Sequence, residues 1–132
     1  MTRIISWDKK EEKQILLPSL KDIEKRHARL FEGFSSGVMT LANAEAFLLR
    51  SIEAFRSGEL SSDELSVIGF EIFHGVAKHH LSSDLYDASL AASELGFYIR
   101  SPHVYKNVVM FLEDINRFYE KNNQKLPLVD NN

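Results

Sequence analysis

The chain has 132 residues, of which 44% are hydrophobic and 27% charged, with a net charge of −3 and no cysteine. This composition favours one globular domain over residues 1–132, and it excludes disulfides, zinc–thiolate sites and a cysteine nucleophile. The chain has no apolar run long enough for a signal peptide or for a membrane span of about 18 residues, so we expect a cytoplasmic protein.

The charges are unevenly distributed. Residues 1–33 carry eight Lys or Arg and six Asp or Glu, residues 34–104 carry four and nine, and residues 105–132 carry four of each. An acidic centre argues against nucleic-acid binding, which needs clustered basic side chains. It favours a basic partner.

Residues 1–18 form an N-terminal segment with an ambiguous pattern. Asp8 and Glu11 have capping-box spacing, which predicts a short helix through Leu17 that Pro18 ends. Trp7 is expected to pack this segment onto the domain. No run in the chain alternates long enough to predict a strand.

Helical spacing of apolar residues, with capping residues before them, predicts an all-α bundle of about five helices joined by short loops over residues 19–123. In the fifth helix, Ser101 is the expected N-cap before Pro102. The third helix is apolar on most sides, which predicts that its neighbours enclose it, and Gly69 and Gly75 could let another helix approach closely. The predicted helices span residues 19–34, 40–56, 61–80, 83–99 and 101–121, with a tail over residues 124–132.

Two similar stretches, "FSSGVMT" at residues 34–40 and "FRSGELS" at residues 55–61, mark helix-to-helix joints. Gly37 and Gly58 lie where helices are expected to end, and glycine tolerates the left-handed backbone needed there. Thr40 and Ser61 follow three residues later as N-caps. The pattern does not continue at residues 76–82, so it predicts turn architecture and not a solenoid repeat.

Three histidines lie close together in the third helix: His74, His79 and His80. A zinc-binding helix usually places two ligands four residues apart, whereas spacings of five and six turn these side chains onto different faces. The serine pairs fit helix caps better than nucleophiles, and no phosphate-binding loop is present. We therefore expect no metal, no cofactor and no catalytic residue.

An acidic stripe runs along the predicted fourth helix, where Asp84, Asp87, Glu94 and Tyr98 share a face without an interleaved cation. One interpretation is a solvated helix face. The other is a docking surface for a basic protein, with tyrosines as anchors. The candidate partner-binding residues are Asp63, Glu64, Glu71, Asp84, Tyr86, Asp87, Glu94 and Tyr98.

The stretch "FSSGVMTLANAEAFLLRSIEAFRSGELSSDEL", residues 34–65, and the acidic stretch after it resemble the small, cysteine-free, helical immunity proteins of bacterial toxin systems, such as colicin-type and contact-dependent growth inhibition systems. The resemblance implies a one-to-one complex with a cognate toxin, often a nuclease (an RNase or DNase), whose basic active site is occluded. It carries over no residue roles. The lysine-rich first segment departs from a uniformly acidic immunity protein.

Two other interpretations stay open. One is an enzyme or small-molecule binder with a pocket between helices, lined by His74, His79, His80 and Tyr105. The other is an adaptor or regulator that binds another host protein. A DNA-binding regulator would need a basic recognition helix, and the helices after the two glycine joints are acidic or neutral.

Overall fold

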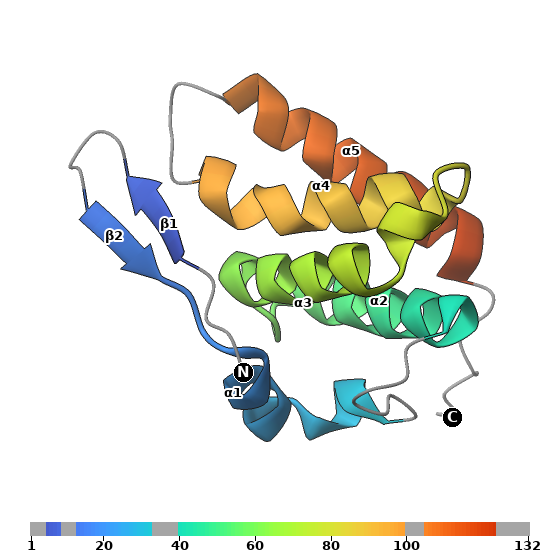
Figure 1. The fold of residues 1–132 in the computed structure, drawn as a ribbon, viewed down its shortest axis with the longest axis horizontal. Coiled ribbons are helices and arrows are strands. Elements are labelled where there is room, and N and C mark those ends of the chain that lie inside the picture. Colours follow the sequence, from blue (N-terminus) through green and yellow to red (C-terminus); the bar gives the residue numbers. More distant parts are fainter. Residues whose placement is uncertain (1–4, 9–12, 33–39, 100–104, 124–132) are drawn as a thin grey trace.

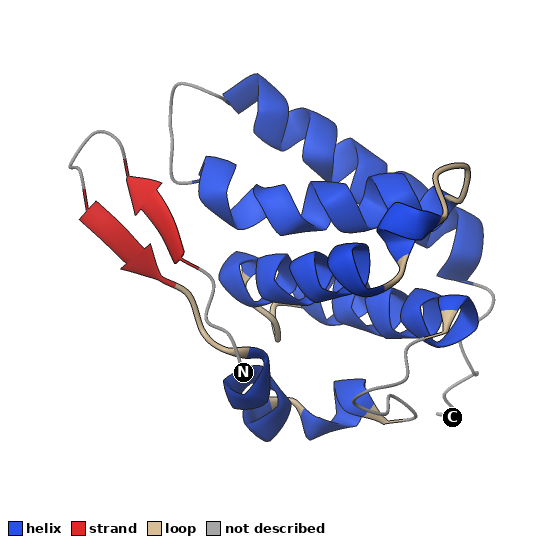
Figure 2. Cartoon of the chain, viewed as in Figure 1, coloured by secondary structure: helices blue, strands red, loops and turns tan. Residues whose placement is uncertain are grey.

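The computed structural model describes residues 5–8, 13–32, 40–99 and 105–123 (Figure 1). The predicted bundle of about five helices is confirmed (Figure 2). Its elements are β1 (Ile5–Asp8), β2 (Lys13–Leu16), α1 (Leu20–Arg26), the 3-10 helix η1 (Ala28–Phe31), α2 (Leu41–Arg56), α3 (Ser62–Gly75), the 3-10 helix η2 (Ala77–His79), α4 (Asp84–Ile99) and α5 (Tyr105–Asn122).

Helix α2 packs against α3, α3 against α4 and α4 against α5, and α5 also packs against α2. This closes a four-helix core in which α4 lies between α3 and α5 (Figure 1). Helix α1 and η1 cross one side of that core, where they contact α3 and α2. The large side chains that α2 to α5 bury most completely are apolar: Phe47, Leu48, Leu49, Ile52, Leu65, Ile68, Ile72, Leu85, Leu95 and Ile115.

The short helix predicted from Asp8 to Leu17 is wrong. The described residues there form an antiparallel hairpin, in which Asp8 pairs with Lys13 and Ile5 with Leu16 (Figure 2). Each strand has only four residues, and although β1 alternates apolar and polar residues, β2 does not, so the sequence pattern is weak. The capping-box spacing at Asp8 is therefore coincidental, and cross-strand pairing decides the local structure.

Two predicted helices end earlier than expected. His27 has a non-helical backbone, with φ −134° and ψ 51°, so α1 ends at Arg26. The 3-10 helix η1 follows directly after His27. Val76 likewise has a non-helical backbone at φ −137°, so α3 stops at Gly75 and gives way to η2. Phe34, Gly37, Ser101, Pro102 and residues 124–132 lie outside the described residues.

The predicted N-caps Thr40 and Ser61 are confirmed, and Ser19 caps α1 in the same way. The Ser83 hydroxyl, at the start of α4, instead donates to the His80 carbonyl at 2.8 Å. The side chains of Ser19 and Thr40 accept hydrogen bonds from backbone N–H groups three residues later, each at 3.1 Å. Ser61 does the same for Glu64, whose carboxylate accepts in return from the Ser61 N–H at 2.9 Å. This reciprocal pair is a full capping box, and it fixes the start of α3.

Helices α3 and α4 approach very closely. A Cβ built on Gly69 would lie 2.7 Å from the Cβ of Ala92, so only glycine fits at this crossing. The buried Ser66 hydroxyl donates to the Ala92 carbonyl at 2.9 Å and accepts from the Gly96 N–H at 2.6 Å. These two groups are an i, i+4 pair of α4, so the serine ties α3 directly into the backbone of its neighbour.

The turn between α2 and α3 needs glycine at one position. Gly58 has φ +89°, and no atom lies within 4 Å of a Cβ built there. Its substitution therefore costs backbone strain and not packing. The N–H groups of Glu59 and Leu60 both donate to the Ala54 carbonyl, which closes the end of α2.

We predict that Gly58→Val lowers the free energy of unfolding by about 1 kcal/mol or more, because a side chain disfavours the left-handed backbone. Urea denaturation followed by circular dichroism measures the change. Gly75→Ala is the control, since Gly75 is the exposed last residue of α3 and alanine favours helix. Equal or higher stability of Gly58→Val would contradict the role of this turn.

Candidate functional site

The predicted acidic residues fall into two groups in the structure. Glu71 on α3 and Glu94 on α4 are half-buried at the surface, and Asp87 on α4 is exposed. None of the three has a hydrogen-bond or ion-pair partner within the described part of the chain. They are available to contact a partner, unlike the acids described next.

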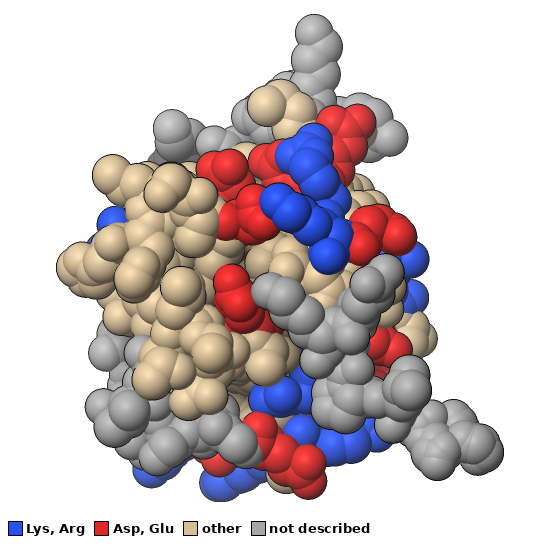
Figure 3. All heavy atoms as spheres, turned by 90° about the vertical axis from the view of Figure 1, so that its right-hand side faces the viewer, with Lys and Arg blue, Asp and Glu red and all other residues tan. Residues whose placement is uncertain are grey.

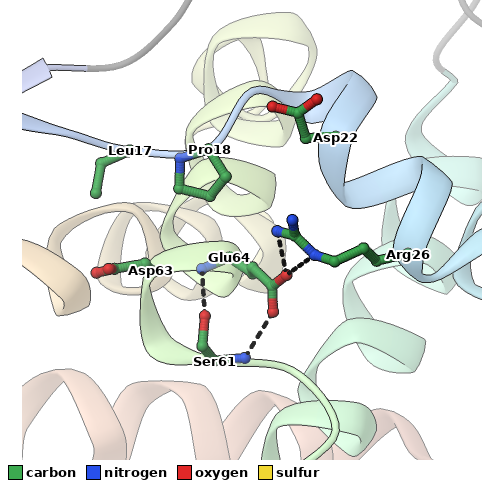
Figure 4. A pocket seen from close by; sticks show the side chains of 7 residues that line it. All are labelled: Leu17, Pro18, Asp22, Arg26, Ser61, Asp63 and Glu64. Atoms are coloured by element: carbon green, nitrogen blue, oxygen red, sulfur yellow. Dashed lines mark hydrogen bonds and ion pairs between the residues drawn. The ribbon is translucent and has the colours of Figure 1, made fainter.

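Glu64 points inward and holds the fold together. One of its oxygens accepts from Arg26 Nε at 3.0 Å and Nη2 at 2.7 Å (Figure 4). The same oxygen lies 3.3 Å from His27 Nε2. The other completes the capping box with Ser61. Its side chain is 10% exposed. These bonds of Glu64 to Arg26 and Ser61, called here the Glu64 clamp, join α1 to the start of α3. Glu64 is therefore not available to contact a partner.

The other two predicted acids, Asp84 and Asp63, differ in their surroundings. Asp84 forms an ion pair with Lys121 of α5 at 2.9 Å, so this acid joins α4 to α5. Ala91, seven residues along α4 from Asp84, is buried at 2% exposure. Asp63 borders the hollow in Figure 4, where its side chain points away from Glu64.

The two predicted tyrosine anchors have different outcomes. Tyr86 is half-buried, and its ring meets that of Phe73 edge to face at 5.1 Å. It directly precedes Asp87 in α4, and its ring contact helps to join α4 to α3. The side chain of Tyr98 lies outside the described residues.

An aromatic cluster on α3 was not among the predicted site residues. Phe70 is 37% exposed, and its ring lies 4.3 Å from that of His74, which also contacts Phe73 at 5.2 Å. The expectation that neighbours enclose α3 is therefore wrong on this side. Enclosure was inferred from apolar residues around the helix, whereas the structure leaves the Phe70 side uncovered.

The remaining histidines lie at the turn between α3 and α4. His79 and His80, with Leu41, Leu81, Ser82 and Ser83, line an open hollow at that end of the bundle. Figure 3 views this end and shows a broad area of described surface nearly free of charged side chains, next to a band of mixed charge. His74 does not line the hollow, so the three histidines of the predicted pocket are not brought together there. Tyr105 begins α5, and its side chain lies outside the described residues.

A second open hollow lies where α1 meets the start of α3 (Figure 4). Its polar lining includes Asp22, Asp63 and the Arg26–Glu64 ion pair. Within the described ranges, no group of three or more His, Asp or Glu side chains is placed to hold a metal ion. None of the described helices is long and apolar enough to cross a membrane.

The fold and site thus define a helical bundle with an acidic and aromatic face on α3 and α4. Comparisons with protein families, curated proteins and solved structures found no match for this chain.

The Glu64 clamp predicts a pH dependence. Burial raises the pKa of this carboxyl. The Ser61 N–H, Arg26 and His27 together lower it by more than burial raises it, so the pKa falls below its ordinary value. Stability from the ionised group is then present at neutral pH. It is lost as the pH falls through the lowered pKa.

We expect Glu64→Gln to lower the free energy of unfolding by about 1–3 kcal/mol at pH 7, with a smaller difference from the parent chain near pH 3. Chemical denaturation across this pH range measures both values. Glu24→Gln, at an exposed site on α1, should follow the parent chain. A difference for Glu64→Gln that does not change with pH would show that its charge does not stabilise the fold.

Proposed function

We propose that this chain is a protein-binding domain that docks a basic protein on the exposed face of α3 and α4. The observation that carries this proposal is the set of unpaired acids, Glu71, Asp87 and Glu94. Two of them, Asp87 and Glu94, are seven residues apart and so lie on one side of α4, about two turns from each other. Such charges speed the approach of a basic partner and help to fix its orientation.

The specific form that we propose is an immunity protein, which neutralises a cognate bacterial toxin by covering its basic active site. The sequence resemblance supplies this class, and the charge of the α3–α4 face supports it. A toxin that cleaves nucleic acid presents cations at its active site, which fits an acidic inhibitor. In this proposal the chain inhibits by occlusion and has no catalytic role of its own.

The rival of a helical enzyme has less support. The two hollows are open to solvent, and the one in Figure 4 contains the Arg26–Glu64 pair that stabilises the fold. A site for chemistry usually gathers polar groups in a more enclosed pocket. An adaptor that binds another host protein would use the same α3–α4 face, so the partner's toxicity distinguishes these two functions.

The test begins with the proteins encoded beside this chain's gene. Each is expressed alone and with the chain, and growth is measured. We expect one basic protein to arrest growth alone and to be neutralised in a one-to-one complex. A non-toxic partner would indicate the adaptor function, and no bound or neutralised protein would reject the proposal.

The double charge reversal Asp87→Lys with Glu94→Lys then tests the face. We expect association with that protein to slow at least about tenfold at low salt, because steering by the acids is lost. The matched control, Glu24→Lys with Glu113→Lys, makes the same change in net charge at exposed positions on α1 and α5. If both variants slow association equally, net charge and not this face controls binding.

A further inference from the structure

A chain of four contacting rings runs along the α3–α4 face, with Phe70 and His74 exposed and Phe73 and Tyr86 half-buried. The rings of Phe70 and His74 are 4.3 Å apart, His74 meets Phe73 at 5.2 Å, and Phe73 meets Tyr86 of α4 at 5.1 Å. Phe70 is in the middle of α3, yet 37% of its surface is exposed. Exposed aromatic groups held by their neighbours are typical anchor points of protein interfaces.

The unpaired acids lie on both sides of these rings. Because Gly69 meets Ala92 at the helix crossing, Phe70 lies level with the middle of α4, between the heights of Asp87 and Glu94. On α3, Glu71 follows Phe70 directly and lies further from α4. The face is therefore aromatic in its centre and negatively charged along both edges.

We propose that this face binds arginine side chains of the basic partner, with Phe70 as the ring on which a guanidinium stacks. This inference deepens the protein-binding proposal and rests on it. A guanidinium suits such a face because its plane stacks on an aromatic ring while its N–H groups reach a carboxylate at the edge. The lysine ammonium is a compact, strongly hydrated charge without a plane, so it stacks less well on an aromatic ring.

A second copy of this chain fits the face poorly. Two copies joined face to face would bring the acids at the edges close to one another. Like charges oppose such contact and cost free energy at an interface. An uncharged apolar partner would leave the same acids without a partner as water is removed. Charge complementarity therefore favours an arginine-bearing partner.

The test uses two probe peptides that need no knowledge of the natural partner, Ac-Gly-Arg-Gly-Arg-Gly-NH₂ and the same peptide with Lys in place of Arg. Each is titrated into isotope-labelled full-length chain at low salt, and NMR follows the aromatic rings and side-chain carboxyl groups. We expect the Arg peptide to shift the signals of Phe70, His74, Tyr86, Glu71 and Asp87. We expect it to bind at least about threefold more tightly than the Lys peptide.

Phe70→Leu is the decisive variant, because leucine keeps an apolar contact on α3 but removes the ring. We expect it to lose the preference for Arg while it keeps the parent chain's circular dichroism spectrum. Leu81→Ala, at a side chain that is 73% exposed in the α3–α4 turn, should keep the preference. A variant of Phe70 that does not fold would be replaced by His74→Ala, for which the same loss is expected.

Equal binding of the two peptides, signal changes away from the face, or an Arg preference that survives Phe70→Leu would each overturn the inference. These outcomes are independent of the growth test. A chain that neutralises a toxin but shows no Arg preference keeps the proposed function and loses this inference. A chain that prefers Arg but neutralises no toxin keeps the surface and loses the immunity function.

Discussion

The close contact between α3 and α4 is the constraint on which the rest of the structure depends. At Gly69 the two helices are too near for any side chain, and Ser66 bonds to two backbone groups of α4 at the same crossing. This buried hydroxyl both donates and accepts a hydrogen bond, and these bonds offset the cost of removing it from water. The two helices then act as one surface, which brings acids and aromatic rings together from separate parts of the chain.

The carboxylates of this protein have separate structural and surface roles. Glu64 is buried and bonded to α1 and to its own helix cap, so its removal would leave Arg26 and the Ser61 N–H without their partner. Asp84 joins α4 to α5 through Lys121, and the Tyr119 hydroxyl donates to Glu53 at the contact of α5 with α2. Contacts with distant parts of the chain distinguish these acids from the unpaired ones, although all are equivalent in the sequence.

Most helices of the bundle could be predicted because their signals are local. Caps at Ser19, Thr40 and Ser61 act within one turn, and the glycine at residue 58 determines its own backbone conformation. The hairpin could not be predicted, since its strands are stabilised by pairing with each other and each is short. At the end of the first helix, His27 contacts Glu64, 37 residues away, and no local signal predicts this contact.

The candidate site was predictable in chemical type but not in composition. Helical spacing placed Asp87 and Glu94 together, whereas the partner of Asp84 comes from a different helix that periodicity cannot locate. The exposure of Phe70 could not be predicted from the sequence either. An apolar residue in an apolar helix is ordinarily assigned to the core, and only the finished packing shows that no described helix covers it.

Leaving acids unpaired on one face costs this fold little, which explains how such a surface can persist. Exposed ion pairs contribute about 0–1 kcal/mol, so a lysine beside Asp87 or Glu94 would add little stability. The same lysine would weaken the local field that attracts a basic partner. The large stabilising terms lie elsewhere, in the packed core and the Glu64 clamp. The α3–α4 face can therefore keep its charges and exposed ring for binding while the interior maintains the fold.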